Sequence, residues 1–253
     1  MLRATLLLLL AVRLEAATEY RVAFELTGNP LYRANGPSVY TVLVDGAHQR
    51  VLDEGRGGFL SNDGGKTKIH LDPKLKTWWT SEESAIFGRL LPTLLLPMMT
   101  KATARDVRVV SSDEPSDEMF ADLPTHKYVV RATYTLATKI DGSPLSADFG
   151  LTIFLWTNET LDPATAVPAV DLTTGVPPVD GQLAPKIAAV RGFPLKTVLI
   201  ATRAYAGGKP QVSTLTATVS DIRSVTPPPG AFDRPRDYVN QAPIVGAPGA
   251  PHP

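Results

Sequence analysis

Large apolar residues recur at every second position through most of this chain, and this alternation restricts its fold more than any other feature. Between residues 20 and 26 charged or small residues separate the apolar ones. A period of two places the apolar side chains on one face of a β-strand. The same pattern, or a short β-prone run, recurs at 40–44, 49–52, 59–60, 68–71, 74–79, 106–110, 127–136, 148–156, 193–204 and 211–225. We therefore expect about ten strands.

Short glycine-containing turns separate these strands. Asp45-Gly46 and Asp141-Gly142 each lie between two alternating segments, which is typical of two-residue hairpins. Parallel strands need long crossover connections, and such connections are rare here. The sequence therefore predicts an antiparallel sheet.

Residues 82–101 have a different period. Apolar pairs follow one another about one helical turn apart. The pairs are Ile86/Phe87, Leu90/Leu91, Leu94/Leu95 and Met98/Met99. Thr80 and Glu83 fit a capping box before this helix, and Pro92 and Pro97 would bend it. We expect a kinked helix that is unusually apolar for a surface element.

The predicted fold class is α+β, mostly β. A curved antiparallel sheet or incomplete barrel of about 10–11 strands would wrap around the central apolar helix. A short second helix is expected at 182–190, ended by Gly192. This arrangement hides one face of the sheet and every face of the apolar helix.

The first residues have the order of a secretory signal. Arg3 precedes an apolar run at 4–12, and small residues follow at Ala16 and Ala17. The run is about half as long as a membrane-spanning helix. We therefore expect a signal peptide at 1–17, export to the periplasm, and no integral membrane span after cleavage. The domain would cover 18–226, and the proline-rich tail at 227–253 is expected to be disordered.

Charge and composition exclude several classes of function. The 25 basic and 25 acidic side chains balance, so the chain lacks the basic surface that nucleic-acid binding needs. It contains no cysteine, which excludes disulfides, iron–sulfur clusters, cysteine zinc sites and a lipoprotein anchor. A folded core must therefore be held by packing alone.

The polar residues form no recognisable catalytic or metal site. The four histidines lie far apart in the sequence. The acidic loop at 111–118 lacks the ligand spacing of a calcium-binding loop. Asn158-Glu159-Thr160 is a glycosylation sequon, relevant only to a eukaryotic secretory route. We expect a non-catalytic protein with no cofactor and no metal.

Several short sequence segments resemble those of the LolA/LolB-like superfamily of periplasmic lipoprotein carriers, in particular an uncharacterised branch of bacterial exported proteins. They are the strand at 20–26, Val44-Asp45-Gly46-Ala47 with Arg50, Trp78-Trp79, Leu155-Trp156-Thr157-Asn158, Arg191-Gly192-Phe193-Pro194-Leu195, and the strand at 216–225 followed by Phe232-Asp233-Arg234-Pro235. The resemblance covers residues 20–238, nearly the whole folded part.

The resemblance implies an incomplete antiparallel barrel of about eleven strands, plugged by helices over a hydrophobic cavity that accepts acyl chains. Two departures matter. The chain has no lipoprotein cysteine and no strongly basic surface, and none of its residues matches a ligand-contacting position of the carriers one to one. Lipoprotein transport itself is therefore not implied.

Two interpretations of the apolar helix stay open: it is filled core, or it lines a cavity or forms a movable lid. In the second case a hydrophobic cavity would be bounded by Trp78, Trp79, Phe87, Leu91, Leu94, Leu95, Met98, Met99, Phe154 and Trp156. The leading hypothesis is an exported protein that binds or carries a lipid or acylated molecule. The alternative is a structural or protein-interaction domain of the cell envelope with a filled core and an envelope protein as partner.

Overall fold

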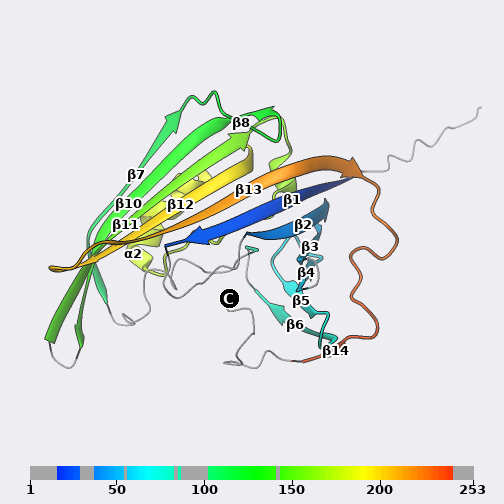
Figure 1. The fold of residues 1–253 in the computed structure, drawn as a ribbon, viewed down its shortest axis with the longest axis horizontal. Coiled ribbons are helices and arrows are strands. Elements are labelled where there is room, and N and C mark those ends of the chain that lie inside the picture. The colour runs from blue at the N-terminus through cyan, green and yellow to red at the C-terminus, as the bar shows by residue number, and fades with distance from the viewer. Residues whose placement is uncertain are drawn as a thin grey trace, which may run out of the picture.

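The computed structural model describes residues 16–28, 37–53, 56–82, 85–86, 102–140 and 143–241. Strands account for most of them (Figure 1). The strands are β1 (Ala17–Thr27), β2 (Ser38–Asp45), β3 (His48–Asp53), β4 (Gly57–Ser61), β5 (Lys68–Asp72), β6 (Thr77–Ser81), β7 (Thr103–Glu114), β8 (Met119–Phe120), β9 (Leu123–Pro124), β10 (His126–Ile140), β11 (Ser143–Asn158), β12 (Phe193–Tyr205), β13 (Gln211–Val225) and β14 (Val239–Asn240). The helix α2 (Pro177–Ala188) and a 3₁₀ turn, η1 (Pro163–Thr165), complete the described part.

Twelve of these strands form one large, curved, open sheet. Their order is β14-β6-β5-β4-β3-β2-β1-β13-β12-β11-β10-β7, and the β8–β9 hairpin stands apart. Every neighbouring pair is antiparallel except β14 with β6. The prediction of a mostly β protein with an antiparallel sheet is confirmed at this level. Figure 1 shows the long strands β7 and β10–β13 in one half and the short strands β2–β6 in the other.

Hairpins connect most sequence neighbours, as the turn residues predict. The β2–β3 hairpin closes with Asp45 paired to His48, so its two loop residues are Gly46 and Ala47. Gly46 has a φ of 56°, a left-handed conformation that glycine adopts without steric cost. The turn therefore lies one residue later than the Asp45-Gly46 signal suggests.

The structure places some element boundaries differently from the sequence pattern. Residues 73–76 form a turn, so the strand expected at 74–79 begins only at Thr77. The helix expected at 182–190 begins at Pro177. Proline is tolerated in the first helical turn, where backbone N–H groups lack partners in any case. The apolar helix expected at 82–101 falls mostly outside the described residues.

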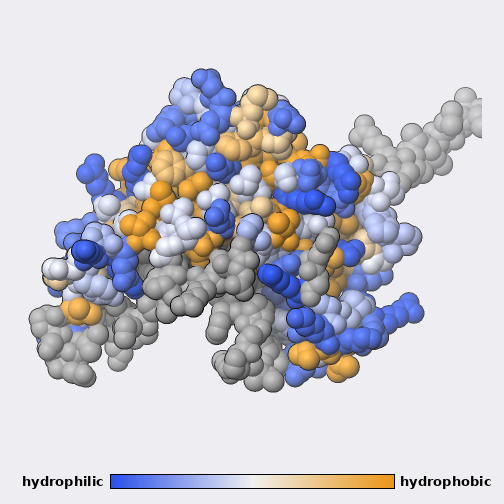
Figure 2. Space-filling view, in the orientation of Figure 1, coloured by the Kyte–Doolittle hydropathy of each residue, from blue (hydrophilic) through white to orange (hydrophobic). Residues whose placement is uncertain are grey.

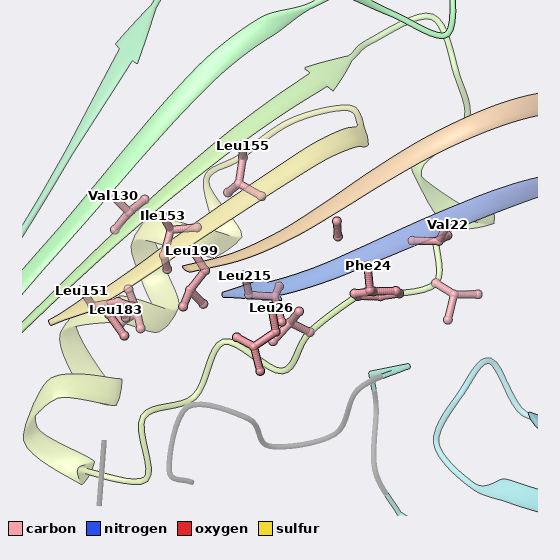
Figure 3. Close-up of a cluster of buried hydrophobic side chains, with 14 of the residues drawn as sticks. Val22, Phe24, Leu26, Val130, Leu151, Ile153, Leu155, Leu183, Leu199 and Leu215 are labelled. Carbon is pink, nitrogen blue, oxygen red and sulfur yellow. The ribbon is translucent and has the colours of Figure 1, made fainter. Parts of the chain in front are cut away.

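One face of the sheet, here called the inner face, carries the main apolar core. The residue row Val130, Ile153, Leu199, Leu215 and Leu26 runs straight across five adjacent strands. The helix α2 packs over the β7–β10 end of this face with Val179 and Leu183. Figure 3 shows Leu183 of α2 beside Leu151 of β11.

The C-terminal segment, residues 226–241, crosses the opposite or outer face of the short strands. Ala231 packs with Ala17 and Leu43 in a second, small apolar cluster. Further along, β14 adds to β6 through hydrogen bonds from Val239 N to Lys76 O and from Gln241 N to Trp78 O, each 2.9 Å. The structure therefore differs from the expectation of a disordered tail as far as residue 241.

Candidate functional site

The inner face of the short strands carries a row of three aromatic rings. Phe59 of β4, His70 of β5 and Trp79 of β6 are direct cross-strand neighbours. The rings of His70 and Trp79 stack, with centroids 5.1 Å apart and planes 7° from parallel. Phe59 is buried, whereas His70 and Trp79 are partly exposed. The row thus extends the main core toward the sheet edge and leaves ring surface accessible there.

Lys68 lies beside this row, two residues before His70 and therefore on the same face of β5. Its side chain is only 1% exposed. The ammonium donates a hydrogen bond to Ala85 O and lies 4.3 Å from the centroid of the Phe59 ring. These contacts place a cation within the inner surface formed by Phe59, Lys68, His70, Trp79 and Ser81, here called the β4–β6 wall.

His70 is neutral at physiological pH in this environment. Its Nε2 atom lies 2.7 Å from Ser81 Oγ on β6. Burial of the imidazole, together with the positive charge of Lys68, lowers the pKa of His70 to about 4. The β4–β6 wall therefore combines aromatic surface, a neutral imidazole, a hydroxyl and one buried ammonium.

The chain after β6 enters this inner side. The Lys68 ammonium holds Ala85, which is fully buried, and Ile86 N donates to Pro168 O at 2.9 Å. Ile86 packs against the main core, and so does Ala102, where the described chain resumes before β7. The described residues on either side of 87–101 therefore both contact the core of the sheet.

A loop at 159–176 crosses the inner face in front of β1. The Tyr20 hydroxyl donates to Thr165 O at 3.2 Å and accepts from Val167 N at 2.8 Å. Burial raises the pKa of the Tyr20 phenol above its usual range. A second buried phenol, Tyr134, has no hydrogen-bond partner for its hydroxyl among the described residues.

Phe154 and Trp156, predicted as cavity walls, project from β11 on the side opposite Ile153 and Leu155, which belong to the main core. Trp156 is nevertheless nearly buried, because the β8–β9 region covers it. The contacts are a 3.0 Å hydrogen bond from Trp156 Nε1 to Glu118, ring contacts with Phe120 and Phe154, and the ammonium groups of Lys127 and Lys196 over its ring. Phe154 and Trp156 therefore lie on the outer face.

Trp78 and Trp79 are the other two predicted cavity-wall residues that the structure describes. They are adjacent in sequence and lie on opposite faces of the sheet. Trp79 lies on the inner face with His70, whereas Trp78 lies under Arg234, whose guanidinium carbon is 4.2 Å from the ring centroid. The other six predicted residues lie outside the described residues. They are Phe87, Leu91, Leu94, Leu95, Met98 and Met99.

Sequence reasoning missed Phe59, Lys68 and His70 as members of this wall. The sequence holds no signal for Lys68 and His70, because they alternate in this strand with the apolar residues Ile69 and Leu71. The pattern alone would place the lysine outside and the two apolar residues inside.

The sequon asparagine, Asn158, is 3% exposed, and its side-chain oxygen accepts hydrogen bonds from the backbone N–H groups of Thr160 and Leu161. It therefore serves as a turn residue.

Exposed apolar residues gather at the free edge near β14. Leu75, in the turn before β6, and Val239 of β14 are 69% and 68% exposed. Figure 2 shows apolar side chains at this corner of the molecule and others over the middle of the sheet. Of the helices described, none is long and apolar enough to cross a membrane.

The fold and this wall define the chain as a mostly β protein with one large, curved, open sheet whose core lies on its inner face. A scan of family models finds none that matches the chain, and a search of curated proteins finds no match.

Proposed function

We propose that this chain is an exported, non-catalytic protein that binds an acyl chain or a similar apolar ligand on the inner face of its sheet. The supporting observation is the β4–β6 wall, where partly exposed Trp79 and His70 continue a buried apolar core. Ligand sites for apolar molecules are concave, mostly apolar and equipped with few polar groups. The wall has this composition.

The same proposal includes an incomplete barrel of the LolA/LolB-like kind, as the sequence resemblance implies. A curved open sheet with a helix over one end of its inner face supports it. So does the placement of Ala85 and Ile86 against the inner face, since the apolar segment begins there. The periplasm is the proposed location.

The test is titration of the delipidated protein with a fluorescent C16 acyl probe, followed by native mass spectrometry. We expect saturable binding of one probe per chain. Trp79→Ala should weaken binding at least about fivefold, because a buried aromatic contact contributes ~1 kcal/mol or more. Trp78→Ala is the matched control, since Trp78 is adjacent in sequence and faces outward against Arg234. Absence of saturable binding, or equal effects of the two substitutions, would reject the proposal.

The packing of α2 favours the alternative function, a filled-core interaction domain of the cell envelope. Val179 and Leu183 of α2 fill the inner side at the β7–β10 end of the sheet. If the delipidated protein keeps the same stability, binds no acyl probe and carries no lipid when isolated from its own periplasm, this alternative replaces the first. A partner protein would then be sought by cross-linking.

A further inference from the structure

The two edges of the large sheet differ. At one edge, β14 pairs with the outward side of β6. At the other edge lies β7, and no strand among the described residues pairs with its outward side (Figure 1). An exposed edge strand presents backbone N–H and C=O groups that can pair with another chain. The β7 edge is therefore a candidate site for strand addition.

The regular part of β7 is the segment 107–114. Before it, the register of β7 against β10 shifts, and Asp106 has a φ of 53°, which together mark a β-bulge. After it comes Pro115, which has no backbone N–H group to donate. Because a bulge and a proline both interrupt regular pairing, an added strand is confined to 107–114.

This segment carries opposite charges at its two ends. Arg108 and Glu114 lie on the outer face, where they are cross-strand neighbours of Thr133 and Lys127. Arg108 is exposed and has no ion pair within the described part of the chain. The Glu114 side chain is 41% exposed, and its carboxylate lies 3.5 Å from the Lys127 ammonium. A carboxylate has about four lone-pair positions, so Glu114 can accept from an arginine as well as from Lys127.

The charge pattern is complementary to itself in an antiparallel arrangement. When two copies of β7 run in opposite directions about a twofold axis at Ser111, Arg108 of each copy lies directly opposite Glu114 of the other. Both contacts are on the outer face and both are attractive. Parallel pairing in register would instead place Arg108 against Arg108 and Glu114 against Glu114, which is repulsive. The pattern therefore favours a second copy of this chain, in one orientation and one register.

We propose that two copies of this chain associate through their β7 edges, which pair antiparallel about Ser111 and continue the sheet from one molecule into the other. Val110, which is 40% exposed, then packs beside Ser112 of the second copy. A contact of this length buries less surface than stable interfaces do, so we expect a transient dimer with a Kd on the order of 10–100 µM. The association is independent of the proposed acyl binding, because β7 and the β4–β6 wall lie toward opposite edges of the sheet.

The competing explanation is that these charges keep the β7 edge free of partners, as charged residues do on many edge strands. The two explanations differ in what charge reversal does. Protective charges give a monomer, and no combination of reversals creates a specific pair. Complementary charges give a dimer that a single reversal weakens and two matched reversals restore.

The experiment measures self-association of the full chain by sedimentation equilibrium between about 5 and 500 µM. The unaltered chain should dimerise. Arg108→Glu and Glu114→Arg should each raise the Kd about tenfold or more, because each places like charges opposite one another at both contacts. Arg105→Glu is the matched control. Arg105 is also exposed and on the outer face, but it lies beyond the bulge, so its reversal should change the Kd less than about twofold.

A mixture of the two single variants tests the register directly. In a pair made of one Arg108→Glu chain and one Glu114→Arg chain, both contacts are attractive again. Native mass spectrometry should therefore show a 1:1 heterodimer, with a Kd within about threefold of that of the unaltered chain. Far-UV circular dichroism of each variant checks that it is folded.

A monomer throughout the concentration range would overturn the inference and leave the proposed acyl binding untouched. A mixture that forms no heterodimer would overturn it as well, and so would an effect of Arg105→Glu as large as that of Arg108→Glu.

A measurement on the unaltered protein does not depend on how the variants fold. Amide hydrogen exchange is compared at about 3 and 300 µM, concentrations chosen to lie on either side of the expected Kd. Exchange within 107–114 should be slower at the higher concentration, whereas exchange in β6 and β14 should be the same at both. Equal exchange within 107–114 at the two concentrations would overturn the inference.

Discussion

At the scale of single residues, two buried tyrosines on the inner face differ in what their hydroxyl groups do. The Tyr20 hydroxyl joins β1 to the loop at 159–176 through Thr165 and Val167. The Tyr134 hydroxyl has no hydrogen-bond partner within the described part of the chain, although its ring stacks on Phe149. Removing a partner from a buried hydrogen bond is costly, whereas removing an unsatisfied polar atom is not.

Tyr20→Phe should therefore lower the free energy of unfolding by ~1–3 kcal/mol, since it leaves a buried N–H without a partner. Tyr134→Phe should change it by less than ~0.5 kcal/mol or raise it. Urea unfolding followed by far-UV circular dichroism measures both. A larger loss in Tyr134→Phe than in Tyr20→Phe would contradict the hydrogen-bond assignment.

His70 makes stability depend on pH in a defined window. The folded-state pKa of about 4 lies below the usual value of 6.5, so the unfolded chain binds more protons between these values. The free energy of unfolding should fall as pH drops from 6.5 toward 4, by at most ~1.4 kcal/mol per pH unit from this group. His70→Gln should show a shallower dependence across that window. Identical slopes for the two proteins in urea titrations would contradict the burial of a neutral imidazole.

The composition of the wall shows where sequence reasoning stops at this scale. Trp79 was predicted, because tryptophan is large and lies in a strand. Lys68 and His70 were not, because alternation assigns a lysine to the solvent face and Ile69 to the core. The register of β5 against β4 and β6 reverses that assignment, since it pairs His70 with Phe59 and Trp79. Register is a tertiary property that a period-two pattern does not contain.

At the scale of elements, the strands and their hairpins were predictable from the sequence, and the C-terminal segment was not. Alternation and glycine turns are local signals. The segment at 226–241 is rich in proline and poor in large apolar residues. Its order derives from isolated long-range contacts such as Arg234 with Trp78 and Lys76 with Asp237. No local pattern encodes these pairs.

Truncation after residue 228 tests the role of this segment. The deletion removes β14 from β6 and uncovers Leu43 and Ala17 on the outer face. We expect faster amide hydrogen exchange in β6 and β2, because opening of these strands costs less free energy. Exchange in β10–β12 should stay nearly the same, since those strands pair with one another and α2 packs against β10. Unchanged exchange in β6 would show that the segment does not stabilise this edge.

At the scale of the whole molecule, β1 joins the two halves of the sheet. It pairs with β2 on one side and with β13, about 200 residues later in the chain, on the other, as in the pair Ala17 and Val225. The short strands β2–β6 and the long strands β7 and β10–β13 therefore share one core, which includes Phe59 and Leu151. Local patterns predicted the strands and the mostly β class. They did not predict this order, because pairing of the first strand with the last long one has no local signal.

A shared core predicts that both halves unfold together. If β2–β6 opened alone, β1 would lose a paired edge and the inner face would expose its apolar row to water. The chain has three tryptophans, at 78, 79 and 156, which report on the two halves separately. Trp156→Phe leaves the β6 pair as the fluorescent probe, and the double change Trp78→Phe with Trp79→Phe leaves Trp156. Within each variant, fluorescence and far-UV circular dichroism should give the same urea midpoint. The comparison is made inside each variant because each substitution shifts stability by its own amount. A fluorescence midpoint that falls well below the circular dichroism midpoint in one variant would show that its half unfolds first, and would contradict a single core built around β1.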